Sequence, residues 1–243
     1  KARPGVIGIL TGSDLRPLNL GVLTTAGAKI GWKGSDFPDA PKALLPTDKA
    51  RFAGEALAVV VAETKAAAMD AAERVRMSFE ELPPVGTLDA AAAGQGSAIW
   101  QSAPDNRAFE WLSGNADATE KAFAAAAHVV SVDVVQNTLV CNAMEPRAAL
   151  GIYDARNDAY TLHTCSQGVS SLRERIAVDL LKIPREKLRV LTPDVGGGFG
   201  MKAQLYAEQA LVLVAAKMFS RPVKWNGDRV RSEEHTSELQ SRE

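Results

Sequence analysis

The glycine-rich stretch "PDVGGGFGMK", residues 193–202, constrains the fold of this 243-residue chain more than any other. Its glycines, Gly196, Gly197, Gly198 and Gly200, follow an expected strand and precede an expected helix. Glycine adopts positive φ and admits a ligand close to the backbone, at a high cost in conformational entropy. We therefore favour a ligand-binding loop, lined by backbone N–H groups and a helix N-terminus, over the alternative of a plain turn.

Hydrophobic patterning around this loop mixes strands and helices, which predicts an α+β fold. A strand, a helix capped by Thr64 and a second strand are expected within 51–85. Alternating valines predict a half-buried strand at 128–136. The other expected strands are 147–154, 159–165, 186–195 and 221–226, and the expected helices are 116–127, 169–183 and 202–219.

The sequence predicts two domains. An Ala-, Gly- and Ser-rich stretch at 91–114 is typical of a linker, which separates a first domain at 1–90 from a second at 115–231. The chain lacks an initiator Met and a signal-peptide pattern, so we expect it to start inside a longer product. The acidic end, 232–243, has no core face, and we interpret it as a non-native tail.

Composition argues against several classes of partner. The 28 Lys and Arg residues balance 29 Asp and Glu residues, so no strong net electrostatic field favours binding to nucleic acid or to a membrane surface. The most apolar run, 210–216, is too short to span a bilayer. Cys141 and Cys165 suggest a reducing compartment or simple burial, and no Cys/His spacing indicates a protein-ligated metal. We expect a cytoplasmic location, with the periplasm as the alternative.

The glycine loop fits the common phosphate motifs poorly. The Walker pattern fails, because Met201 separates Gly200 from Lys202 and Ala203 stands where Ser or Thr is needed. A dinucleotide pattern nominally matches at Gly198, Gly200 and Ala203, but its acidic partner is missing. An NAD(P)- or flavin-dinucleotide-binding oxidoreductase therefore stays open as an alternative. A non-catalytic module, in which the glycines only form a turn, is the third hypothesis.

Several segments, in order, resemble the molybdenum-binding subunit of the xanthine dehydrogenase/aldehyde oxidase family, nearest to its bacterial carbon-monoxide-dehydrogenase-like members. The resemblance implies an a/b hammerhead domain at 1–90, with its start missing, and a truncated first molybdopterin-binding domain at 115–231. The segments that carry it are "ARPGVIGILTGSDL", "RFAGEALAVVVAET", "AAERVRMSFEELPPV", "MEPRAALGIYD", "TCSQ", "IPREKLRV", "PDVGGGFGMK" and "RPVKW".

The resemblance also implies a cofactor site. Molybdenum–molybdopterin, in the cytosine dinucleotide form, would lie against the backbone of Gly197, Gly198, Phe199 and Gly200, with Gln167 near an oxo ligand. It implies no protein metal ligand and no catalytic residue in this chain, because the family's general-base Glu belongs to a later region. Two glutamates here, Glu145 and Glu208, do not match that motif, and without context Glu145 and Arg147 are interpreted as a polar strand entry.

The implied reaction is hydroxylation of a small-molecule substrate, such as an aldehyde or an N-heterocycle, with water as the oxygen source. Electrons would leave through a 2Fe-2S small subunit and an FAD-binding medium subunit of a hetero-oligomer, so the chain alone is expected to be inactive. Xanthine-type members carry a Glu just after the Lys of the glycine loop. Ala203 stands there, which disfavours a purine substrate.

Overall fold

A computed structural model describes residues 4–23, 41–106, 113–134 and 141–228. The tail expected at 232–243 lies outside these ranges. The chain forms two compact units. The first comprises Lys1–Thr24, Pro41–Glu80 and Leu139–Glu243, and the second comprises Thr25–Ala40 and Glu81–Thr138.

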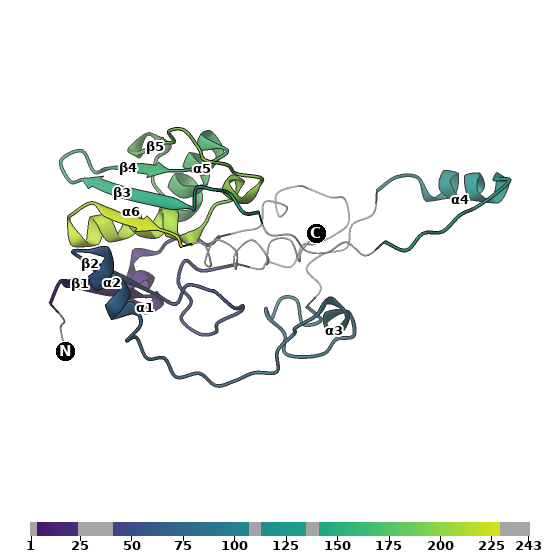
Figure 1. Cartoon of the computed structure of the whole chain (residues 1–243), viewed down its shortest axis with the longest axis horizontal. Coiled ribbons are helices and arrows are strands. Elements are labelled where there is room, and N and C mark those ends of the chain that lie inside the picture. The colour runs from purple at the N-terminus through teal and green to yellow at the C-terminus, as the bar shows by residue number, and fades with distance from the viewer. Residues whose placement is uncertain (1–3, 24–40, 107–112, 135–140, 229–243) are drawn as a thin grey trace. The chain divides into compact units, whose positions relative to one another are not determined.

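A four-stranded sheet organises the first unit (Figure 1). Its strands are β3 (Ala148–Asp154), β4 (Ala159–Thr164), β5 (Leu188–Leu191) and β6 (Val223–Asn226), in the order β5-β4-β3-β6. Strands β3 and β4 form an antiparallel hairpin, β6 pairs antiparallel with β3, and β5 pairs parallel with β4. These four expected strands are therefore confirmed.

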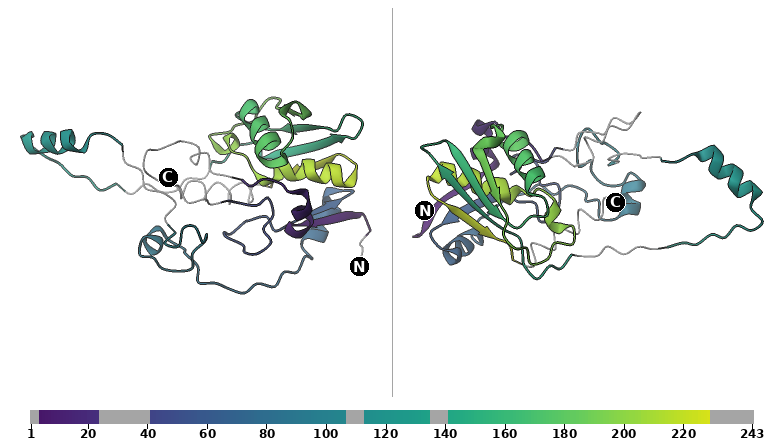
Figure 2. Two further views of the ribbon diagram at one scale, coloured as in Figure 1. Left: turned by 180° about the vertical axis from the view of Figure 1, so that it is seen from behind. Right: turned by 90° about the horizontal axis from the view of Figure 1, so that it is seen from above.

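Helix α6 (Ala207–Phe219) is the most buried element, because every residue from Glu208 to Ala216 is buried. It lies between the four-stranded sheet and a ribbon of β1 (Val6–Thr11) and β2 (Ala58–Ala62) (Figure 1). Figure 2 shows the same layers from behind and from above. Burial on both sides explains why the helix is apolar nearly all round. In the described parts of the chain, no helix has the length and apolarity that a bilayer span needs.

The start of α6 corrects one sequence expectation. The helix was expected to begin at 202, directly after the glycine loop, but a 3-10 turn occupies Met201–Ala203 and α6 begins at Ala207. The Gln209 side chain accepts from the Tyr206 backbone N–H at 3.1 Å, which caps the helix there. The glycine loop therefore does not lie against a helix N-terminus.

The predicted helix at 169–183 forms in two parts. Helix α5 (Val169–Glu174) continues as a π-helical segment, Arg175–Leu181, and ends before Pro184. Its inner face packs into the core of the unit. The buried residues of this face are Leu172, Ile176 and Leu180.

The β1–β2 ribbon shares a core with α6. Its short helices are α1 (Gly12–Leu15), a 3-10 turn at Arg16–Leu18, and α2 (Lys65–Ala72). Thr64 caps α2 as expected, since its Oγ1 accepts the Ala67 N–H at 3.2 Å. The apolar residues that join the ribbon to the α6 core are Leu10, Leu15 and Val61.

Two expected strands are absent from the described residues. The segment before Pro83 and the described part of 128–136 both lack strand structure. Val130, Val132 and Val134 are 75–84% exposed. Alternating side chains specify which face of a strand is apolar, but a strand forms only when a neighbour completes its hydrogen bonds. The second unit instead carries α3 (Leu88–Ala92) and α4 (Ala116–Ala125), the latter confirming the helix expected at 116–127.

The contact between β3 and α6 generates a stability prediction. A Cβ at Gly151 would lie 2.5 Å from the Val212 carbonyl oxygen, so Gly151→Ala must push the helix away from the sheet. We expect a loss of about 1–3 kcal/mol in the free energy of unfolding, measured by urea denaturation. Gly86→Ala is the control, because nothing lies within 4 Å of its Cβ position. Equal urea midpoints for the two variants would contradict this packing.

Candidate functional site

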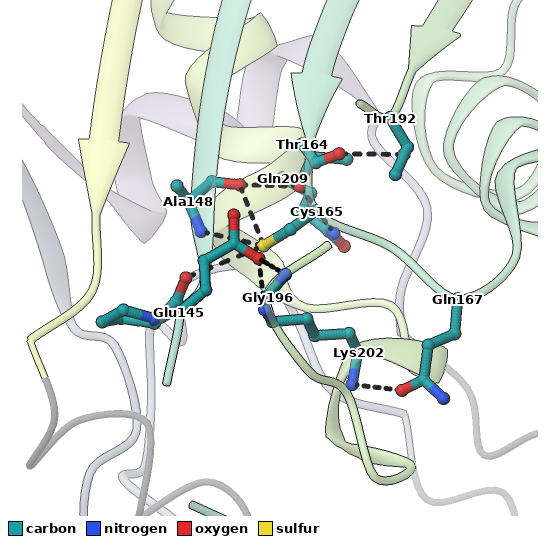
Figure 3. A network of polar contacts seen from close by, with 10 residues as sticks. Glu145, Ala148, Thr164, Cys165, Gln167, Thr192, Gly196, Lys202 and Gln209 are labelled. Carbon is teal, nitrogen blue, oxygen red and sulfur yellow. Dashed lines mark hydrogen bonds and ion pairs between the residues drawn. The ribbon is translucent and has the colours of Figure 1, made fainter. Parts of the chain in front are cut away.

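The glycine loop is tied at both ends to Glu145 (Figure 3). The Glu145 Oε2 atom accepts the Gly196 N–H at 2.9 Å and lies 2.6 Å from the Lys202 Nζ. The Glu145 backbone N–H also donates to the Gly196 carbonyl at 3.0 Å. A single residue before β3 therefore holds the two ends of the loop that follows β5.

Charge at this contact is balanced. Lys202 is only 1% exposed, whereas the Glu145 side chain is 37% exposed. Burial raises the pKa of the Glu145 carboxyl, but hydrogen bonds from Lys202 and the Gly196 N–H outweigh it, so the pKa lies below its usual value. The carboxylate stays ionised at neutral pH and neutralises the buried ammonium group.

Gln167 lies on the inner side of the loop, just after β4. Its backbone N–H donates to the Lys202 carbonyl at 3.0 Å, and its Oε1 accepts the Lys202 N–H at 3.1 Å. A primary amide has two N–H donors on its nitrogen, which remain directed away from this oxygen contact. A Cβ at Gly198 would lie 2.5 Å from Gln167 Oε1. The absence of a side chain at Gly198 therefore permits the glutamine to contact the loop.

The tip of the loop presents a row of backbone donors. Gly197 and Gly200 have φ values of +93° and +88°, and Phe199, with φ +51°, is also left-handed. Among the described residues, the N–H groups of Gly198, Phe199 and Gly200 meet no hydrogen-bond acceptor. Successive N–H groups in such turns form a concave site for anions and other electron-rich ligands. The tip can therefore offer these N–H groups to a ligand, because they do not bond to acceptors in the described part of the chain.

Cys141 buttresses the loop from outside the sheet. Its thiol donates to the Phe199 carbonyl at 3.0 Å, which fixes one backbone group of the tip. The Phe199 side chain is 73% exposed.

A polar network joins the ends of β3 and β4, three residues before Gln167 in the chain (Figure 3). Thr164 is its centre, because its hydroxyl donates to the Ala148 carbonyl at 2.7 Å and accepts from Gln209 Nε2 at 3.2 Å. The Thr192 hydroxyl donates to the Thr164 carbonyl at 2.8 Å. Cys165 Sγ accepts the Ala148 N–H at 3.4 Å, which gives this buried thiol a structural role.

Arg147 points into the core rather than toward the loop. Its guanidinium stacks 3.6 Å from the Tyr206 ring centroid and lies 3.5 Å from Glu208 Oε1. The Tyr206 hydroxyl donates to the Met201 carbonyl at 2.6 Å, and burial raises the pKa of Tyr206 to about 12. Arg147 therefore stabilises the loop only indirectly, through a tyrosine that stays protonated.

The structure brings Gln167 into contact with the loop that carries the four-residue tip, and it separates Glu145 from Arg147. The role of Gln167 and the tip toward a cofactor stays a prediction. Sequence reasoning missed the structural roles of Lys202, Tyr206 and Gln209. A lone lysine between Met201 and Ala203, at the end of a glycine run, was the available signal for an inward-pointing cation.

The dinucleotide alternative loses its geometric basis. In that motif the pyrophosphate lies at the N-terminus of the helix that the glycines open. Here the 3-10 turn and three further residues separate Gly200 from α6, whose first residue is Ala207. Gly198, Gly200 and Ala203 therefore do not form the expected strand–glycine–helix unit.

Comparison with known proteins assigns both parts of the chain. Residues 99–241 match the family model described as the molybdopterin cofactor-binding domain. Residues 1–83 match the aldehyde oxidase and xanthine dehydrogenase a/b hammerhead domain. The carbon monoxide dehydrogenase large chain of Hydrogenophaga pseudoflava is 31% identical over 241 residues, which cover 94% of this chain and 28% of that one. The nicotine 6-hydroxylase large subunit of Paenarthrobacter nicotinovorans is 32% identical, over 93% of this chain and 27% of that one.

Solved structures agree with these relatives. A crystal structure of Cu,Mo-CO dehydrogenase superposes with a TM-score of 0.81 at 28% identity, covering 96% of this chain and 29% of that one. Quinoline 2-oxidoreductase from Pseudomonas putida 86 gives a TM-score of 0.71 at 32% identity, covering 95% and 28%. The chain spans less than a third of the length of these relatives. By its two matched domains, it belongs to the aldehyde oxidase and xanthine dehydrogenase family of molybdopterin-binding proteins.

Proposed function

We propose that this chain forms the cofactor-facing part of a molybdenum-dependent hydroxylase. The observation that carries the proposal is the row of N–H groups at Gly198, Phe199 and Gly200, which meet no acceptor in the described structure and lie beside the Gln167 amide. These are neutral donors of the kind that suit electron-rich oxo and dithiolene groups. Gly197 belongs to the same site, because its positive φ turns the chain into the row.

Charge balance supports this assignment. The ammonium of Lys202 is neutralised by Glu145, and Arg147 is directed into the core beside Glu208. The four tip residues, 197–200, carry no charged side chain, so the tip itself offers fixed backbone dipoles. Preorganised dipoles stabilise charge that develops during a reaction without a cost of reorganisation.

The bound group would be molybdenum–molybdopterin, in its cytosine dinucleotide form. When bound, it supplies two-electron redox chemistry, in which substrate and water give a hydroxylated product, two electrons and two protons. The chain's own residues would orient this group through Gln167 and the loop backbone. The general base would come from another region of the protein, so this chain contributes binding and orientation, and is inactive alone.

The electrons would pass to a 2Fe-2S small subunit and an FAD-binding medium subunit within a cytoplasmic hetero-oligomer. Relatives named as large chains and large subunits, and one named as subunit gamma of a dehydrogenase complex, support an assembly of several subunits. Balanced charge and the absence of a spanning helix in the described parts of the chain agree with such an assembly.

The substrate would be a small aldehyde, an N-heterocycle or a similar molecule rather than a purine. Ala203 is exposed directly after Lys202, and it has no carboxylate with which to bind a purine ring. Relatives whose names include nicotine, quinoline and aldehyde support this range of substrates.

The cofactor content is the first test. We expect the full-length protein to contain about one molybdenum per polypeptide by mass spectrometry, and to release CMP on acid hydrolysis, because the dinucleotide carries a cytidine phosphate. A preparation without molybdenum, or one that binds NAD(P)H tightly and saturably through this chain, would contradict the proposal.

Gly198→Ala tests the loop directly. The new Cβ would displace Gln167, so we expect kcat to fall on the order of 10²-fold, while thermal stability stays close to that of Gly86→Ala. Turnover would be followed by dye reduction with an aldehyde or N-heterocycle that the wild type oxidises. A variant that loses only stability, with normal kcat in the folded fraction, would favour the non-catalytic module.

Gln167→Glu tests the amide donor. The carboxylate keeps the acceptor for the Lys202 N–H but removes the N–H donors and adds a charge. We expect kcat per molybdenum to fall on the order of 10²–10³-fold, as when one preorganised donor is removed. Gln95→Glu makes the same chemical change at an exposed position and should leave kcat unchanged. Wild-type turnover in Gln167→Glu would remove this residue from the site.

A further inference from the structure

One carboxylate oxygen determines where both ends of the glycine loop lie. Glu145 Oε2 contacts the Gly196 N–H at 2.9 Å and the Lys202 Nζ at 2.6 Å. Three short-range backbone hydrogen bonds involve the tip, and they run from the Gly197 N–H to the Val195 carbonyl, from the Met201 N–H to the Gly198 carbonyl and from the Ala203 N–H to the Gly200 carbonyl. With so few internal bonds, the shape of the tip depends on how its ends are held.

Lys202 also connects this contact to the amide. Its side chain reaches Glu145, while its backbone N–H and carbonyl bond to the side chain and backbone of Gln167. A displacement of Lys202 would therefore move the end of the loop and the Gln167 amide together. The two groups proposed to face the cofactor share one anchor.

The stability of the fold does not account for an ion pair at this position. Well-packed apolar residues often replace a buried ion pair without loss of stability. What an apolar pair cannot supply is an acceptor for the Gly196 N–H and a directional bond to the end of the loop. A Cβ at Gly196 would lie 2.6 Å from the Glu145 Cβ, so the loop is built to approach this residue closely.

We propose that the Glu145–Lys202 ion pair is a positioning clasp, which sets the spacing between the row of loop N–H groups and the Gln167 amide. This inference rests on the proposed function, since it assigns the clasp to the cofactor-facing site. Glu145 and Lys202 touch neither cofactor nor substrate, and act only through the loop and Gln167.

The test compares clasp variants in the full-length protein. Glu145→Asp keeps the charge but shortens the side chain by one methylene. The double variant Glu145→Gln, Lys202→Met removes both charges, keeps an amide oxygen for the Gly196 N–H, and leaves no buried unpaired cation. Glu174→Gln is the control, because its exposed ion pair with Arg185, at 3.4 Å, lies on α5 away from the loop.

Four measurements are made on each variant: molybdenum content, kcat and KM, the paramagnetic molybdenum spectrum of partly reduced enzyme, and amide hydrogen exchange across 195–203. For both clasp variants we expect near wild-type molybdenum and KM, with kcat reduced on the order of 10–10²-fold. The molybdenum spectrum should shift, because the donors around the metal have moved. Loop amides should exchange faster, since local opening becomes easier.

The possible outcomes distinguish a failure of the clasp inference from a failure of the proposed function. Wild-type exchange, spectrum and kcat in the double variant would overturn the clasp even if the protein contains molybdenum. Activity that falls only in proportion to thermal stability, with an unchanged spectrum, would also overturn it and leave the pair a purely structural contact. A wild-type protein without molybdenum would overturn the proposed function, and faster loop exchange in the variants would still establish the tether.

Discussion

The burial of α6 on two sides is the constraint on which the rest of the structure depends. The helix fills the space between the four-stranded sheet and the β1–β2 ribbon, and one hydrophobic cluster includes residues from all three. Gly151 allows β3 to approach the helix backbone. On the ribbon, Gly8 leaves room for the Phe219 ring, which a Cβ at this position would contact. Removal of so much apolar surface from water is the main favourable contribution to folding of this unit.

The same helix connects the core to the candidate site. Its first turn supplies Gln209, which bonds to Thr164 at the end of β4, and the residue before the helix, Tyr206, bonds to the carbonyl of Met201. The strand ends, the helix start and the glycine loop are thus held in one network. A loop rich in glycine is intrinsically costly to order, and here the ordering comes from rigid neighbours rather than from the loop's own bonds.

Sequence reasoning succeeded where local pattern and local environment agree. The strands of the sheet and the buried face of 169–183 were predictable, because periodicity reports which side of an element is apolar. The start of α6 was not, because the inward turn of Lys202 depends on Glu145, 57 residues away. The strand expected at 128–136 is absent from the described residues of that range for a related reason, since an alternation of valines does not specify a pairing partner. Long-range partners, rather than propensity, account for the errors.

The valines at 130, 132 and 134 have a consequence for handling the protein. An extended, apolar and unpaired segment can add strands from other molecules, which is the first step of many aggregation processes. Ser131 and Asp133 alternate with the valines, and a charge within such a run opposes stacking of identical segments. The charge of Asp133, placed between Val132 and Val134, therefore opposes self-association through this segment.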